Sequence, residues 1–511
     1  MSQIPILTLL TVLPLVGAGI AVFAGKHART VALITSVASL AVALFVWSEL
    51  PSNGSIGLTE LAAWAPSLGI EYHLGVDALG ALMLVLSAIV TLMSVDAAHR
   101  VHHQPGLYFA LVLVLEAGLF GSFTALNFFH WFLFWELSLI PAFFLIKLWG
   151  GARRGPAATQ FFVYTMAGSV ALLVAFIAVF LSTHSMDFPH LTLLASTGEL
   201  EDAVAAHLGS GFFGVPVMLW LAIGVLAGFA VKVPLVPFHT WLPEAYAEAP
   251  SPVTMLLTGA MSKMGVYGLL RIAIPLFGAQ IATIRTPLLV LAVATVVMGA
   301  WAAVAQRDLK RVFAYSSVNH LGYCLLGIFA LAVPATGVAA AASQAAALNG
   351  VILQMFNHGV TAAALFWFVA MLQARTGGHR GISDFGGLRK PAPVLAGLMG
   401  IALFSSLGLP GLNGFVGEFL IFRGTFSLAW VASTVSILGL LVTATVILTV
   451  IQKVFSGPVP ERLASFPDMT HGERMAMAPV IGLMLLIGIL PQLIVDSVNP
   501  TVVNLLAHWR F

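Results

Sequence analysis

The chain is poor in charged residues. Only 8% of its 511 residues are Asp, Glu, Lys or Arg, and 59% are apolar, whereas an average soluble protein has roughly 25% charged residues. This composition excludes an ordinary soluble domain. Because one helical crossing of a bilayer takes about 20 apolar residues, the length is sufficient for a dozen or more crossings. We therefore predict a single all-α, polytopic membrane domain over residues 1–511.

Cysteine is almost absent as well. Cys324 is the only cysteine, so an internal disulfide is excluded. The sequence has no C-x-x-C pair and no Cys/His cluster, which argues against an iron–sulfur centre or a structural zinc held by this chain. The formal net charge is only +2 and the basic residues are dispersed, which argues against a nucleic-acid partner. We expect neither cofactor nor metal in this chain.

Apolar windows along the sequence predict about fourteen transmembrane helices. The larger polar interruptions, at 52–72, 182–211 and 457–474, are too short for a separate domain. The first apolar stretch, at 5–24, has no basic leader, so we expect a retained span and not a cleaved signal. Every functional residue is therefore expected in the membrane or beside it.

The basic residues predict the orientation of the chain. Sixteen of the 22 Lys and Arg residues fall in the connections after odd-numbered spans, four, including Arg271, fall on the opposite side, and Lys232 and Lys263 lie inside spans. By the positive-inside rule, the crowded side is cytoplasmic. We expect a multi-pass protein of the inner (cytoplasmic) membrane, surrounded by the lipid bilayer, with both termini on the non-cytoplasmic side.

Five charged residues fall inside predicted spans, where each costs roughly 2.5 to 3.5 kcal/mol at the centre of a helix. One interpretation is structural, since buried Glu–Lys pairs fix the register of helices. Two early acids, two central bases and one late acid instead favour a path for protons. The five residues are Glu116, Glu136, Lys232, Lys263 and Glu418.

Histidines also fall within the predicted spans. His320 and His358 are near mid-span, beside Ser, Asn or Thr residues that hold water well, whereas His130 and His239 lie nearer to span ends. A neutral imidazole relays protons near physiological pH. The alternative is an ordinary buried histidine, and the polar neighbours favour the relay for His320 and His358.

Two spans are predicted to be broken. Pro234 and Pro237 interrupt the seventh span, and Pro410 with several glycines interrupts the twelfth, because proline removes a backbone donor and clashes with the preceding turn. Freed backbone groups at membrane depth need protein or water around them. The breaks lie five spans apart, and the same offset relates Glu136 to His320. An odd offset reverses the direction of crossing, which is typical of inverted repeats in transporters.

A family resemblance extends over roughly residues 107–426. In this region the chain resembles the antiporter-like membrane subunits of respiratory complex I and of multisubunit cation/proton antiporters. Glu418 stands where the L and N types of this family are expected to have a lysine. The stretches that carry the resemblance are WELSLIPAFFLI, VKVPLVPFHTWLPEAYAEAPSPVTMLLTGAMSKMGVYGLLR, LKRVFAYSSVNHLGY, NHGVTAAALF and LPGLNGFVGEF.

The resemblance implies a fold and a set of site residues. It implies fourteen core helices with two inverted five-helix repeats, an antiporter-like first half at 107–275 and a second at 285–455. Carried over by motif, Glu136 pairs with Lys232 in the first half-channel and Lys263 is the central relay. The remaining positions are His320 and His358 on the hydrated axis, Glu418 at the end of the second half-channel, and His239 and Glu116 at further family positions.

The implied function is proton translocation within a complex I-type NADH:quinone oxidoreductase. This chain is then a translocase subunit without a redox centre, driven by flavin, iron–sulfur clusters and quinone in partner subunits. The implied partners are L- and N-type antiporter-like subunits and a redox arm. Two alternatives remain, namely a subunit of a multisubunit Na+/H+ antiporter and a scaffold with inactive channels.

Overall fold

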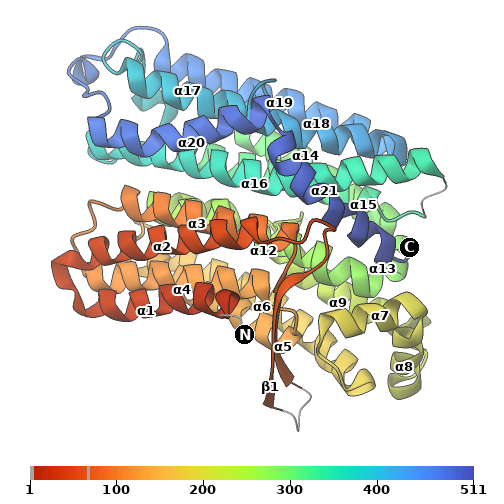
Figure 1. The fold of residues 1–511 in the computed structure, drawn as a ribbon. Helices are drawn as coiled ribbons and strands as arrows, with labels where there is room; N and C mark the ends of the chain where they lie inside the picture. Colours follow the sequence, from red (N-terminus) through yellow and green to blue (C-terminus); the bar gives the residue numbers. More distant parts are fainter. Residues whose placement is uncertain (1–4, 66–69, 335–336) are drawn as a thin grey trace.

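The computed structural model describes residues 5–65, 70–334 and 337–511. Within this part, twelve helical segments are long and apolar enough to cross a membrane, and the predicted polytopic helical architecture is confirmed (Figure 1). The segments are α1 (Ile6–Phe23), Gly25–Ser48 with α2 (Ala28–Ser48), α3 (Ala78–Ala97), α4 (Pro105–Thr124), α5 (Phe128–Trp149), α6 (Arg154–Thr183), Ser251–Thr283, α14 (Arg285–Val304), α15 (Leu309–Ala330), α16 (Val338–Arg375), α19 (Trp430–Phe455) and α20 (His471–Ile489).

Two further apolar segments are broken helices. α9 (Val217–Lys232) ends two residues before Pro234, and the chain resumes as α10 (Trp241–Glu248). Likewise, α17 (Pro393–Leu407) ends before Pro410, and α18 (Asn413–Leu428) follows. Both interruptions lie where proline was predicted to place them. The number of fourteen crossings and the inverted repeats remain predictions.

The segment Ser251–Thr283 has irregularities that the sequence did not predict. Two π-helical turns, η3 (Leu257–Met261) and η4 (Leu269–Ala273), stand on either side of α12 (Lys263–Gly268). The outer parts are α11 (Ser251–Leu256) and α13 (Ile274–Thr283). A π-turn shifts the backbone hydrogen bonds and frees carbonyl groups, and such turns are frequent at functional sites.

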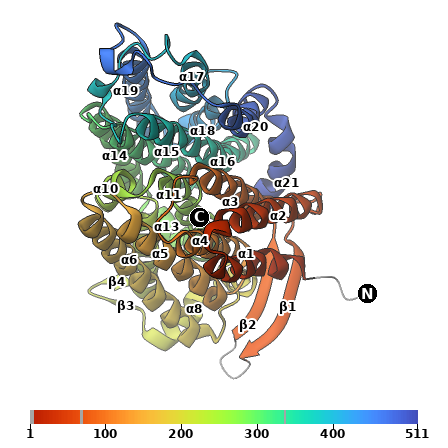
Figure 2. The same ribbon diagram turned by 90° about the vertical axis from the view of Figure 1, so that its left-hand side faces the viewer.

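The helices form two groups that lie one above the other in Figure 1. The lower group contains α1 to α6 and α9, and the upper group contains α14 to α20. Figure 2 shows the same two groups after a quarter turn. The two groups share a packing pattern. In the lower group α4 packs against α5, as α14 packs against α15 in the upper group, and α6 packs against α9, as α16 packs against α18.

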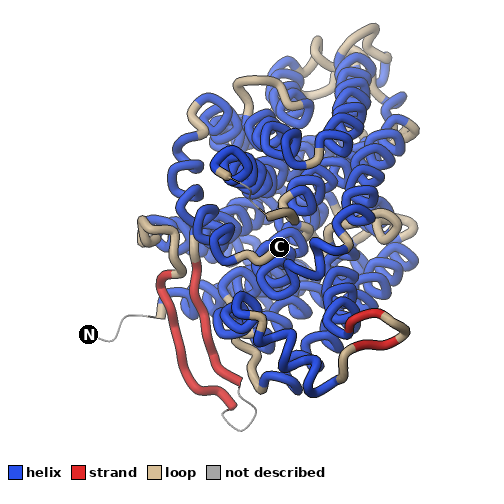
Figure 3. Tube along the Cα trace, turned by 90° about the vertical axis from the view of Figure 1, so that its right-hand side faces the viewer, coloured by secondary structure: helices blue, strands red, loops and turns tan. Residues whose placement is uncertain are grey.

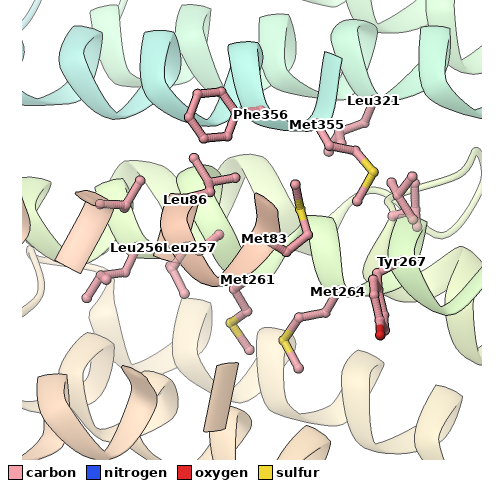
Figure 4. Packing of buried hydrophobic residues seen from close by; sticks show 14 of the residues in the cluster. Met83, Leu86, Leu256, Leu257, Met261, Met264, Tyr267, Leu321, Met355 and Phe356 are labelled. Atoms are coloured by element: carbon pink, nitrogen blue, oxygen red, sulfur yellow. The ribbon is translucent and has the colours of Figure 1, made fainter. Parts of the chain in front are cut away.

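The core lies between the two groups. Most residues are buried in α3, α15, Ser251–Thr283 and the part of α16 at 347–372. The elements α3, α11 and η3 pack against α16. Figure 4 shows Met83, Leu257 and Phe356, from three of these elements, within this apolar layer. The charged residues described below therefore lie in the best-packed part of the molecule.

Short polar side chains fix where several helices begin. Asp77 caps α3 by accepting from Gly80 N at 3.1 Å, and Asn127 caps α5 by accepting from Phe129 N at 3.0 Å. Asp308 caps α15 by accepting from Lys310 N at 2.8 Å. A cap satisfies backbone donors that the first turn leaves free. These residues therefore fix where α3, α5 and α15 begin, and with it the position of each later residue along the helix.

The polar interruptions contain ordered structure that the sequence analysis had left unassigned. Within 52–72 and just beyond it, β1 (Gly57–Ala65) and β2 (Ile70–Val76) form an antiparallel hairpin that projects from the helices (Figure 3). A second, smaller hairpin pairs β3 (Gly211–Phe212) with β4 (Val215–Pro216). The remaining elements outside the bundle are α7 (Phe188–Thr197), α8 (Glu199–Leu208) and α21 (Gln492–His508).

The close approach of α4 and α5 yields a stability prediction. A Cβ added at Gly118 lies 2.8 Å from Ser138 N, whereas a Cβ at Gly400, in α17, meets nothing within 4 Å. We expect Gly118→Ala to destabilise the protein by about 1 to 3 kcal/mol through overpacking. Gly400→Ala is the control and should be neutral or stabilising, because alanine favours helix. The test is the unfolding temperature of the purified complex, followed by tryptophan fluorescence. If Gly118→Ala and Gly400→Ala unfold at the same temperature, the prediction is contradicted.

Candidate functional site

Lys263 and His358 form the first contact of the candidate site. Lys263 begins α12, separated from the end of η3 by one residue, and is fully buried. Its Nζ lies 2.8 Å from His358 Nδ1, in the middle of α16, and also donates to the carbonyl of Thr258 within η3. The π-turn thus supplies a backbone acceptor for a fully buried ammonium, as a buried cation requires.

His320 and Glu418 continue from this pair. The ring centroids of His358 and His320 are 5.2 Å apart, and His320 Nδ1 lies 3.0 Å from Glu418 Oε1. Between 3% and 7% of each of these side chains is exposed. Four predicted residues, from Ser251–Thr283, α16, α15 and α18, therefore stand in one buried row, which we call the central row: Lys263, His358, His320 and Glu418.

A small polar cavity adjoins the central row. It is lined by His320, His358 and Glu418 and by the hydroxyls of Thr361, Ser405 and Ser406, and its volume is about 10 Å³. That volume is close to the least that holds one water molecule. Ser406 Oγ lies 3.2 Å from His320 Nε2, so both ring nitrogens of His320 have polar neighbours.

Lys232 and Glu136 lie apart from the central row and from each other. Lys232 is the last residue of α9, is 2% exposed, and places its Nζ 4.5 Å from the ring centroid of Trp135. Glu136, its predicted partner, follows Trp135 in α5. Among the described residues, however, no ion pair within 4.0 Å joins them, and Glu136 Oε1 is buried without a hydrogen-bond partner.

Glu116 and His239 are two further predicted residues that the structure does not join to the central row. Glu116, in α4, is fully buried, and within the described ranges neither of its carboxylate oxygens has a hydrogen-bond partner. His239 lies in the break between α9 and α10 and is half-buried. Neither contacts the central row.

The sequence analysis missed Gln354. Its Nε2 lies 3.5 Å from both His320 Nδ1 and Glu418 Oε1, so it sits at the junction of α15, α16 and α18. A signal was available, since Gln354 precedes His358 by four residues and thus shares its helix face.

Arg271 is a correction to the sequence analysis. It was assigned to an external connection, but it lies inside the helix, in η4, and is 8% exposed. It forms an ion pair of 2.5 Å with Asp77, the cap of α3. Asp77 follows a polar interruption and lies far away in sequence, so spacing alone gave no indication of a partner for Arg271.

A second charged cluster anchors the half-helix α10. Glu244 accepts two hydrogen bonds from Arg311, at 2.8 and 2.9 Å, which is the bidentate geometry of a strong ion pair. Arg380 contacts Asp308 at 2.6 Å and Glu248 at 3.6 Å. These contacts hold α10 against α15 at one end of the bundle. In the described part, no group of three or more His, Cys, Asp or Glu side chains converges as metal ligands do.

Comparison with known proteins identifies the family. Residues 125–447 match the transmembrane family described as NADH:quinone oxidoreductase/Mrp antiporter. The chain is 34% identical to NADH-quinone oxidoreductase subunit M from Rhodobacter capsulatus, over 99% of this chain and 97% of that protein. It is 32% identical to the subunit M of Mycobacterium tuberculosis, over 99% of this chain and 94% of the relative.

Solved structures agree with this assignment. A chain of respiratory complex I from Thermus thermophilus has a TM-score of 0.85 at 27% identity and covers 99% of this chain and 100% of its own length. A chain of the Mrp complex from a Dietzia species has a TM-score of 0.83 at 23% identity, covering 99% and 98%, which indicates a shared fold only. The resemblance predicted from the motifs is confirmed. This chain therefore belongs to the NADH:quinone oxidoreductase/Mrp antiporter transmembrane family.

Proposed function

We propose that this chain is a proton-translocating membrane subunit of an NADH:quinone oxidoreductase, in which protons move along Glu, Lys and His side chains. The observation that carries the proposal is the central row, because four buried ionisable side chains follow one another from Lys263 to Glu418. Similarity over almost the full length of subunit M proteins supports the same class of activity.

The central row has the chemistry of a proton relay. The Lys263 ammonium donates toward His358 Nδ1, 2.8 Å away. An imidazole that accepts a proton at one nitrogen releases one from the other, so His358 passes a proton toward His320, with a water in the adjacent cavity bridging the two rings. His320 Nδ1 then donates to Glu418 at 3.0 Å. Glu418 is the terminal acceptor of this path.

Glu136 and Lys232 act as the switch in this proposal. Opposite unit charges 4 Å apart attract by about 4 kcal/mol at an effective dielectric constant of 20. When the Glu136 carboxylate approaches Lys232, this attraction stabilises the protonated form of the lysine. The end of α9 packs tightly on α12, since a Cβ at Gly265 lies only 3.2 Å from Lys232 Cβ. When Glu136 withdraws, Lys232 releases its proton toward Lys263 and the central row.

The energy for pumping comes from partner subunits. Moving one charge through the membrane potential costs about 2.3 kcal/mol per 100 mV. We propose that flavin, iron–sulfur clusters and quinone in a redox arm supply this energy, with L- and N-type subunits beside this chain. We place the complex in the inner membrane, and by the positive-inside rule both termini of this chain then face the non-cytoplasmic side.

A second candidate is a subunit of a multisubunit Na+/H+ antiporter. The matched family favours it, because its description includes the Mrp antiporter beside NADH:quinone oxidoreductase. The two candidates differ in their partners, because an antiporter subunit copurifies with small antiporter subunits, whereas the first candidate copurifies with iron–sulfur and flavin proteins. A scaffold with inactive channels copurifies with the same proteins as the first candidate but tolerates loss of the relay residues.

Lys263→Met tests the centre of the relay. Methionine has a similar length and is apolar, so the helix should fold while the donor to His358 is lost. We expect redox-driven proton pumping to fall by about a hundredfold, the scale at which a proton-transfer group contributes, with the complex still assembled. Lys26→Met, at an exposed lysine, is the matched control. Proton uptake into inverted vesicles is measured, and wild-type pumping by an assembled Lys263→Met complex refutes the relay.

Glu418 is tested by two substitutions of opposite character. Glu418→Gln keeps the shape and the contact with Gln354 but cannot be ionised, so pumping should be abolished. Glu418→Lys provides another titratable group beside His320 and should retain part of the activity. Glu461→Gln, at an exposed position, controls for the loss of a carboxylate. Full pumping by Glu418→Gln assigns Glu418 a structural role.

Glu136→Gln separates the leading candidate from its rivals. A blocked proton step stalls the coupled electron step, so quinone reduction should be lost while NADH-dependent reduction of an artificial acceptor persists. Glu199→Gln, at an exposed glutamate, is the control. Both rates are measured on the same membranes, with abundance checked on native gels.

Each other outcome of this experiment has a definite meaning. Loss of both rates at normal abundance contradicts separate electron and proton paths. An unchanged quinone reductase rate favours the scaffold. Absence of quinone reductase activity from the purified wild-type assembly favours the antiporter.

A further inference from the structure

A cavity lies at the end of the molecule where α21 covers the N-terminus of α3. Its volume is about 390 Å³, and it is bounded by elements that include α7, α13 and α21. Its outer margin includes the exposed residues His508 and Pro189, and its inner end is formed by the buried residues Asp77 and Arg271. The cavity therefore opens outward and ends at a buried ion pair.

The ion pair is held from several directions. Arg271 Nη2 contacts Asp77 Oδ2 at 2.5 Å, and Asp77 Oδ1 accepts from Gly80 N in the first turn of α3. The guanidinium also lies 5.7 Å from the ring centroid of Tyr267, a cation–π distance. Asp77 thus faces two positive groups. One is the guanidinium of Arg271, and the other is the N-terminal end of α3, whose helix dipole carries about half a unit charge. The charges of the guanidinium, the carboxylate and the helix end therefore sum to a net positive value.

An apolar layer separates this pair from Lys263. The two cationic residues lie on the same helical segment, about 12 Å apart along its axis at 1.5 Å per residue. Between them, Met264, Val266 and Leu270 are buried, and Figure 4 shows Met264 and Tyr267 on this stretch. The Tyr267 hydroxyl donates to Phe123 O at 3.0 Å, so its proton is directed to a backbone carbonyl and not along the axis.

We propose that Arg271, positioned by Asp77, is a cationic barrier that prevents protons from leaking between the outer cavity and Lys263. A guanidinium does not give up its proton at any physiological pH, so it cannot relay one. Its charge and the adjacent helix N-terminus repel an incoming proton, as arginines and helix ends do in proton-excluding pores. The inference rests on the proposed function, because a barrier matters only where Lys263 carries protons.

The experiment measures passive proton leak without turnover. The assembled complex is placed in liposomes with a potassium diffusion potential, and an internal pH dye follows proton entry in the absence of NADH. Arg271→Met removes the cation, whereas Asp77→Asn breaks the ion pair but keeps the cation and the cap of α3. We expect about a tenfold faster leak for Arg271→Met and a wild-type leak for Asp77→Asn. Arg285→Met, at an arginine that does not line this cavity, is the control.

The double variant Asp77→Asn/Arg271→Met keeps the test decisive, because Arg271→Met alone leaves a buried carboxylate without its partner. We expect the double variant to leak as fast as Arg271→Met. An equal leak in Asp77→Asn and Arg271→Met assigns the effect to packing and overturns the proposal, as does a wild-type leak in the double variant. Redox-driven pumping by the wild type is recorded separately, so failure of the proposed function is recognised independently of the leak.

Discussion

The cost of a charge away from water governs this structure, because every ionisable group inside the bundle needs either a polar partner or a hydrated space. Several helices deviate from regular geometry near such groups. Lys232 ends α9, Lys263 follows η3 and uses a carbonyl of that turn, and Arg271 lies within η4. Glu418 lies shortly after the break between α17 and α18. The irregular backbone supplies acceptors and space that an unbroken helix does not, because its carbonyls are already bonded.

The charges in the two halves of the molecule are arranged differently. In the second half, His320 and Glu418 are in contact, and Lys263 reaches them through His358. In the first half, Lys232 lies against Trp135, without an ion pair to Glu136 among the described residues. In the proposed mechanism this conformation is the one in which the switch is open and the central row is connected. Movement of the α5 and α9 side chains then changes the charge that Lys263 experiences, without rearrangement of the well-packed core.

Much of this arrangement follows from local sequence. Apolar length predicted the spans, and Pro234, Pro237 and Pro410 predicted the breaks, because steric exclusion by proline acts within one turn. The mid-span position of His320 and His358 suggested their role as candidate relay residues, and both are buried. The β-hairpin, the π-turns and the partner of Arg271 were not predicted. The partner of Arg271 depends on a contact between residues distant in sequence, Asp77 and Arg271, and the hairpin likewise depends on its long-range surroundings. A π-turn shifts the helix by only one residue, and such a shift is not visible in the hydrophobic pattern.

Directional transport requires that one route from Lys263 conducts while another stays closed. Along the helix axis toward α13, Lys263 is followed by two turns of buried apolar residues and then by Arg271, none of which passes on a proton. Across the bundle, it faces His358 at 2.8 Å, followed by His320 and Glu418. In the proposed mechanism, a proton on Lys263 therefore has a lateral path of titratable groups and an axial path closed by a fixed cation. The proposed direction of transport thus follows from the placement of non-titrating residues as much as from that of the relay.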